Sequence, residues 1–150
     1  METTQIKGID HTVRDTKAYL NGEGAKLMIR DKLMTHKDQH ADAIFDVEMN
    51  GVKSTCDLIS RAVAQGESTQ TFKAAIVGNA QCSSHTECDA IIMDNARISA
   101  TPEITANDLD AALIHEAAIG RIAGEQLIKL MTLGLTEEEA EQEIIAGFLK

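Results

Sequence analysis

The sequence has 150 residues, which is enough for one domain that buries about two-thirds of the surface of its unfolded chain. Apolar residues make up 43% and aromatic residues only 3%, so aliphatic side chains must fill the interior. The formal net charge is −10 and no stretch concentrates Lys or Arg, which argues against a nucleic-acid partner and against attachment to an anionic membrane.

The compartment is indicated by the apolar runs and the cysteines. No apolar run approaches the roughly 18 residues of a membrane span. Met1 to Gln5 has no feature of a signal peptide, so a cytoplasmic location is expected. The three cysteines, Cys56, Cys82 and Cys88, contain no Cys-x-x-Cys pair and are expected to be reduced.

Up to about residue 105 the chain alternates short apolar segments with turn residues. After Asn21-Gly22 an apolar run spans Ala25 to Met34, and a polar segment from Thr35 to Asp42 follows. From Ile44 to Met49 apolar and acidic residues alternate, and the turn dipeptide Asn50-Gly51 comes next. A period of two is typical of β-strands.

The alternation continues after Asn50-Gly51. One predicted face carries Cys56, Leu58, Ser60 and Ala62. Further extended segments are predicted at Phe72–Val77, Cys82–Met93 and Ile98–Ile104, the last of which contains the only proline, Pro102. Short strands at regular spacing fit either a β-sandwich or a β-solenoid. Small inward-facing residues and scarce aromatics favour stacked coils.

The C-terminal part has a different pattern. Leu113 to Ile122 (LIHEAAIGRI) fits a helix by its alanines and a strand by its alternation. Glu125 to Leu133 is predicted as a helix with one apolar face, ended by Gly134. Thr136 to Glu139 forms a capping box with three acids in the first turn. The second helix is expected to bury Ala140, Ile144 and Phe148.

Motifs that carry catalysis are missing, since the sequence has no phosphate-binding loop, nucleophile elbow or zinc-protease motif. An enzyme is therefore not expected. Possible metal ligands do gather, because Cys82, His85 and Cys88 lie within seven residues and His115-Glu116 follows. Thiolate, imidazole and carboxylate groups bind iron or zinc. On a strand, however, His85 would face away from both cysteines.

From Thr86 to the C-terminus the chain resembles the C-terminal part of the SufB/SufD family of iron–sulfur cluster assembly scaffolds. The matching segments are ECDAII (87–92), LIHEAAIGRI (113–122), EQL (125–127), GLTEEEA (134–140) and GF (147–148). Members of that family are longer than this chain.

The resemblance implies a mainly β fold, a right-handed parallel β-helix with LIHEAAIGRI as its last strand and two short C-terminal α-helices. The β-helix core would span residues 1–122. Residues 123–150 would form a helical segment that docks SufC, the ABC-type ATPase of the same system.

Three residues acquire roles from the same resemblance. Cys88 matches the SufB-type cysteine needed for cluster assembly, Glu116 the SufB-type glutamate, and His115 the SufD-type histidine. They would hold a transient iron–sulfur cluster at the interface of a homodimer or of a pair with a SufB/SufD-type partner. Residues 115 and 116 are adjacent on a strand, so only one of them can approach Cys88 in the same chain.

Two alternatives stay open at this point. One is an interaction module that docks the ATPase and dimerises without binding metal. The other is a small zinc protein that uses Cys82, Cys88 and a histidine.

Overall fold

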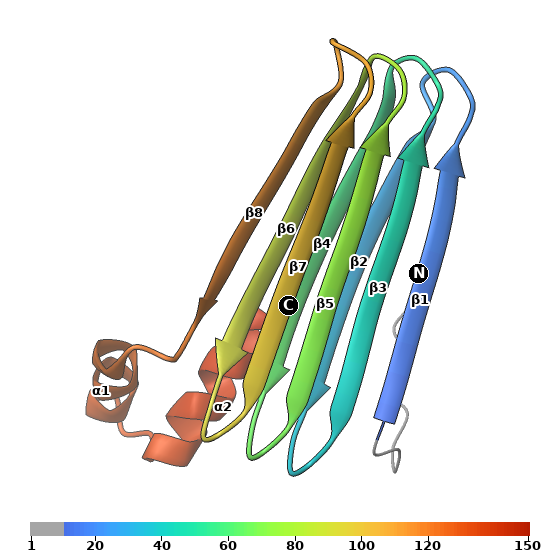
Figure 1. Cartoon of the computed structure of the whole chain (residues 1–150). Helices are drawn as coiled ribbons and strands as arrows, with labels where there is room; N and C mark the ends of the chain where they lie inside the picture. Colours follow the sequence, from blue (N-terminus) through green and yellow to red (C-terminus); the bar gives the residue numbers. More distant parts are fainter. Residues whose placement is uncertain (1–10) are drawn as a thin grey trace.

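The computed structural model describes residues 11–150, so the expectation for Met1 to Gln5 lies outside the described residues. Eight β-strands followed by two α-helices make up this range (Figure 1). The strands are β1 (His11–Leu20), β2 (Lys26–Thr35), β3 (His40–Met49), β4 (Ser54–Ala64), β5 (Thr69–Gly78), β6 (Cys82–Ile92), β7 (Arg97–Ala106) and β8 (Ala112–Gly120). The helices are α1 (Gly124–Thr132) and α2 (Glu137–Phe148).

The strands form two four-stranded sheets, in the orders β1-β3-β5-β7 and β2-β4-β6-β8. Every pairing is parallel, and each coil of the chain adds one strand to each sheet (Figure 1). The result is a β-solenoid of about four turns with two short helices at its C-terminal end. The predicted parallel β-helix is therefore confirmed, and the β-sandwich is excluded.

The interior lies between the two sheets and follows the predicted alternation. In β3 the buried positions include Phe45, Val47 and Met49. In β4 all four residues of the predicted face, Cys56, Leu58, Ser60 and Ala62, are buried. Coils of this kind bury small and aliphatic side chains in flat layers, which explains how the chain folds with so few aromatic residues.

Successive coils are joined by an asparagine ladder, defined here as Asn21, Asn50, Asn79 and Asn107. Each of these residues follows a strand of the first sheet. The Asn50 Nδ2 donates to Asn21 Oδ1 over 2.8 Å, Asn79 donates to Asn50 over 2.7 Å, and Asn107 donates to Asn79 over 2.7 Å. Since neighbours are 28 or 29 residues apart, the ladder marks the length of one coil.

The turn at Asn50-Gly51 stacks tightly on the turn of the preceding coil. A Cβ atom at Gly51 would lie only 2.0 Å from the carbonyl oxygen of Gly22. Glycine is required there because the two backbones approach too closely for any side chain. This dipeptide links strands of different sheets, and so it does not form a β-hairpin.

The ambiguous segment LIHEAAIGRI forms β8, which pairs with β6. Gly134 has a φ of +99° just after the end of α1, as predicted for a residue that terminates a helix. Thr136 begins α2 with both hydrogen bonds of a capping box. Within residues 11–150, no helix has the length and apolar character needed to cross a membrane.

The predicted buried face of α2 is partly wrong. Ala140 and Ile145 are buried, whereas Ile144 and Phe148 are only half-buried. Phe148 lies at the end of α2, where its ring is covered by the Arg61 guanidinium at 5.9 Å. In α1 no residue is buried.

Candidate functional site

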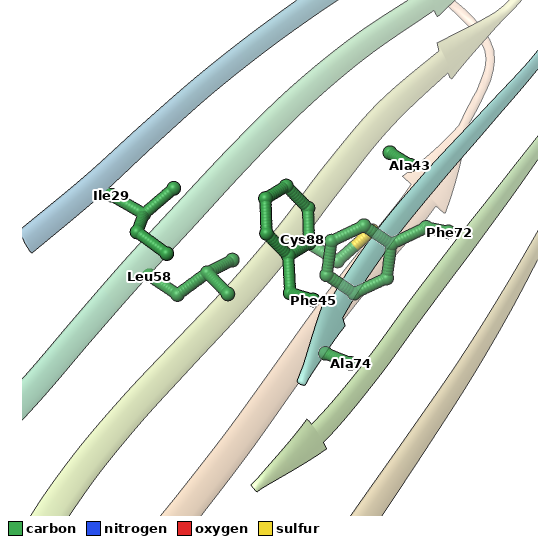
Figure 2. Close-up of a cluster of buried hydrophobic side chains, with 7 residues drawn as sticks. All are labelled: Ile29, Ala43, Phe45, Leu58, Phe72, Ala74 and Cys88. Carbon is green, nitrogen blue, oxygen red and sulfur yellow. The ribbon is translucent and has the colours of Figure 1, made fainter. Parts of the chain in front are cut away.

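Cys88 is an inward-facing residue of β6 and only 1% exposed. Its neighbours form a cluster made of Ile29, Ala43, Phe45, Leu58, Phe72 and Ala74. Figure 2 shows its sulfur among the rings and aliphatic side chains of this cluster. Burial, followed by the negative charges of Asp89 and Asp31, raises the pKa of the Cys88 thiol to about 11. The group is therefore a protonated thiol at neutral pH.

His115 shares the interior with Cys88. On β8 it aligns with Thr86, whereas Cys88 aligns with Ala117 two residues further on. The His115 ring is half-buried, and its centroid lies 6.4 Å from that of Phe72, a member of the Cys88 cluster. Cys88 and His115 thus occupy diagonal positions on neighbouring strands and flank the same aromatic ring.

The imidazole of His115 is available as a ligand. Its Nε2 is buried and has no hydrogen-bond partner among residues 11–150. Burial and then the nearby His85 lower the pKa of His115, which favours the neutral ring. A neutral imidazole with an unpartnered nitrogen can bind a metal or exchange a proton.

Glu116 lies on the outer face of the same sheet. Its Oε2 is 3.3 Å from His85 Nε2, and His85 Nδ1 is 3.4 Å from Asp57 Oδ1. The bonds to Glu116 and then to Asp57 raise the pKa of His85. Within one chain the sheet separates Glu116 from Cys88, so His115 is the one of the two adjacent residues that approaches the cysteine.

A buried polar row next to Cys88 was not predicted from the sequence. Arg14 Nη1 lies 2.6 Å from Asp31 Oδ1, and Ser60 Oγ donates to Asp31 Oδ2 over 3.1 Å. Ser60 aligns directly with Cys88 in the neighbouring strand. In the sequence, Asp31 is the middle one of three consecutive charged residues within an apolar run, and only the period of two marks it as inward-facing. Cys88 therefore belongs to an apolar cluster and neighbours a serine that bonds to a partly buried ion pair.

Cys82 and Cys56 belong to a second buried cluster with Leu20, Val47, Met49 and Ile76. Cys82 and Cys88 are six residues apart on one strand, which separates them by about 20 Å. Zinc–sulfur bonds measure only about 2.3 Å, so one ion cannot bind both cysteines of one chain. His85 faces away from both, as predicted. The single-chain zinc site with Cys82 and Cys88 is therefore wrong.

Comparisons with known proteins found matches that cover most of the chain. A family model described as "SUF system FeS cluster assembly, SufBD core domain" matches residues 1–148. An iron–sulfur cluster assembly SufBD family protein of Methanothermobacter thermautotrophicus is 34% identical over 88% of this chain and 33% of that protein. The iron–sulfur cluster assembly protein SufB of Bacillus subtilis is 30% identical over 93% of this chain and 31% of that protein. The chain thus spans about a third of the length of these relatives.

Proposed function

This chain belongs to the SufBD core-domain family of the SUF system for iron–sulfur cluster assembly, and we propose that it is a non-catalytic scaffold on which a nascent cluster is assembled. The cluster is the cargo of such a scaffold. The observation that carries the proposal is that Cys88 and His115 face the same interior space from neighbouring strands. Together they supply a sulfur and a nitrogen ligand for iron.

Loading the site requires local opening, because the Cys88 sulfur is buried. β8 is the strand to move, since it lies at the edge of its sheet and pairs only with β6. Lifting β8 would withdraw His115 from Phe72 and admit iron and sulfide. Binding of a metal ion then displaces the thiol proton and stabilises the thiolate.

A further ligand, Glu116, is proposed to come from a second chain that pairs with this one. β7 and β8 are the edge strands of the last coil, and β7 carries Pro102, which hinders the addition of another strand. β8 has no proline and exposes Ile114 and Ile119. We therefore place a homodimer, or a pair with a SufB/SufD-type partner, at β8, where Glu116 of one chain can approach the Cys88 site of the other.

The helical segment fits the docking of a SufC-like ABC ATPase. α1 buries none of its residues, and it exposes Ile128 while Leu133 at its C-cap is 77% exposed. Exposed apolar residues gathered on one short helix are typical of a protein–protein contact. With reduced cysteines, the proposed scaffold would act in the cytoplasm, without a nucleic-acid or membrane partner.

Anaerobic reconstitution with ferric iron and sulfide tests the scaffold. The wild-type chain is expected to develop the charge-transfer absorption of a bound cluster, and Cys88→Ser to lose most of it. Cys56→Ser is the matched control, because Cys56 is also buried and burial also raises its pKa to about 11. Equal absorption in the wild type and Cys88→Ser would refute the proposed ligand.

An interaction module without metal is the second candidate. It is favoured by the dry environment of Cys88, which is 1% exposed among apolar side chains. In that case the chain would bind no iron, and Cys88→Ser would still retain the SufC-like ATPase in a pull-down.

A further inference from the structure

A group of metal-binding side chains lies on the outer face of the first sheet, where β1 and β3 begin. His11 pairs with His40 across the two strands, and Asp42 follows two residues after His40. One ligand atom from each of the three lies within 4.8 Å of the others. His11 Nε2 is 3.1 Å from Asp42 Oδ2, and His40 Nε2 is 3.6 Å from Asp42 Oδ1. Both imidazoles therefore direct a ring nitrogen at one carboxylate.

The neighbouring strand orients the His40 ring. The Nδ1 of His40 hydrogen-bonds to the hydroxyl of Thr69, which aligns with His40 on β5. A histidine that binds metal through one nitrogen usually donates from the other, and this second bond fixes both the tautomer and the ring plane. With Nδ1 engaged by Thr69, Nε2 is left for the position beside Asp42.

The same neighbouring strand also contacts the carboxyl group. Asp42 has a side-chain hydrogen bond with Thr71 besides the one with His11. Thr71 aligns with Asp42 on β5, just as Thr69 aligns with His40. Two hydroxyls on one strand therefore support the imidazole and the carboxylate of the next.

We propose that His11, His40 and Asp42 form a binding site for a divalent transition-metal ion, with two imidazole nitrogens and one carboxylate oxygen as ligands. This donor set suits zinc or ferrous iron and leaves positions open for water. His11 is exposed and the other two are half-buried, so the ion has direct access from solvent. The site is independent of Cys88, which faces the interior from the other sheet.

Binding would have a structural consequence as well. His11 belongs to the first described coil, and His40 and Asp42 belong to the second. An ion bound to all three would join the two coils, and a ligand that binds only the folded chain stabilises it.

Equilibrium dialysis of the tag-free chain against zinc, followed by elemental analysis, tests the site. Cys88→Ser serves as the background, so that thiol binding at the proposed cluster site does not contribute. One equivalent of zinc is expected. His40→Asn and Asp42→Asn should each weaken binding at least tenfold, and Thr69→Val should weaken it about tenfold.

His36→Asn is the matched control, because His36 is an exposed histidine in the loop just before β3. The His36→Asn variant should bind zinc as tightly as the Cys88→Ser protein in which it is made. Cobalt(II), substituted for zinc, should give visible absorption bands that disappear in His40→Asn. Zinc should raise the melting temperature of the proteins that retain His40 and leave that of His40→Asn unchanged. Unchanged affinity in His40→Asn, or an equal loss in His36→Asn, would overturn the assignment.

Discussion

Within a single chain, Glu116 contacts the imidazole of His85 and raises its pKa. His85 lies between Asp57 of the preceding coil and Glu116 of the following coil, and both carboxylates favour its charged form. His85 is therefore a direct reporter of the position of Glu116.

We predict that Glu116→Gln lowers the pKa of His85 toward its ordinary value of 6.5, since the first of the two bonds that raise it is removed. The raised pKa stabilises the folded chain below pH 6.5, and this contribution is lost as the pH rises through the raised value. Titration of the His85 ring protons by NMR measures the change. A His85 pKa that is the same in both proteins would show that Glu116 lies elsewhere in solution.

The buried carboxyl of Asp31 also makes the stability of the folded chain depend on pH, in a direction that its raised pKa fixes. Burial raises the pKa of Asp31 above 3.8, although Arg14 and Ser60 act in the opposite direction. The folded state thus holds this proton more tightly than the unfolded chain does. Its stabilising contribution is complete below about pH 3.8 and is lost as the pH rises through the raised pKa.

We predict that the wild type loses stability relative to Asp31→Asn as the pH is raised from 3.8, because the amide cannot ionise. Urea unfolding of both proteins across this range gives the difference in unfolding free energy. Other titrating groups cancel in that difference. A difference that stays constant with pH, or rises, would contradict the raised pKa.

Among the elements, the turns that join the two strands of each coil hold successive coils in register through the asparagine ladder. Asn50 takes part in two of its side-chain bonds, to Asn21 and from Asn79, whereas Asn107 takes part in one. A neutral hydrogen bond contributes about 1 kcal/mol to stability. The middle of the ladder should therefore matter more than its end.

We predict that Asn50→Ala lowers the unfolding free energy by about 2 kcal/mol and Asn107→Ala by about 1 kcal/mol. Urea denaturation measures both values, and the urea dependence should stay unchanged if the fold is preserved. Equal losses in the two variants would mean that the ladder bonds contribute less than the turn conformation itself.

Local patterns in the sequence predict where strands and helices lie, but they do not predict which strands pair with one another. Alternation around Leu58 and the capping box at Thr136 depend on adjacent residues, so strands and helices are correctly predicted there. The pairing of β6 with β8 joins residues 29 positions apart, and local pattern cannot decide it. The spacing of Asn21, Asn50 and Asn79 is visible in the sequence and would have revealed the repeat.

The candidate site was predictable to a smaller extent. The family resemblance singles out Cys88, His115 and Glu116, but which of the last two faces Cys88 depends on the register of β8 on β6. The period of two turns Asp31 inward, but its contact with Arg14 and the meeting of His11 with His40 depend on contacts between strands far apart in the sequence. Such contacts are set by stacking and not by neighbours in the sequence.

For the molecule as a whole, the proposed association would use the exposed edge of β8. Ile114 is 54% exposed on this strand, and a lysine there would place a charge in any strand-to-strand contact. We predict that Ile114→Lys shifts a dimer to monomers without loss of thermal stability. Analytical ultracentrifugation determines the mass, and Val13→Lys on the opposite edge is the control. A dimer that persists in Ile114→Lys but dissociates in Val13→Lys would place the contact at β1.

The repeat marked by the asparagines makes the solenoid modular, because every interior coil presents the same two stacking surfaces. A segment of 28 or 29 residues could be duplicated or deleted between two ladder positions while the turns on either side still meet. The length of such a solenoid can therefore change by whole coils. Each added or deleted coil changes the distance between its first and last coils by about 4.8 Å, the separation of neighbouring strands.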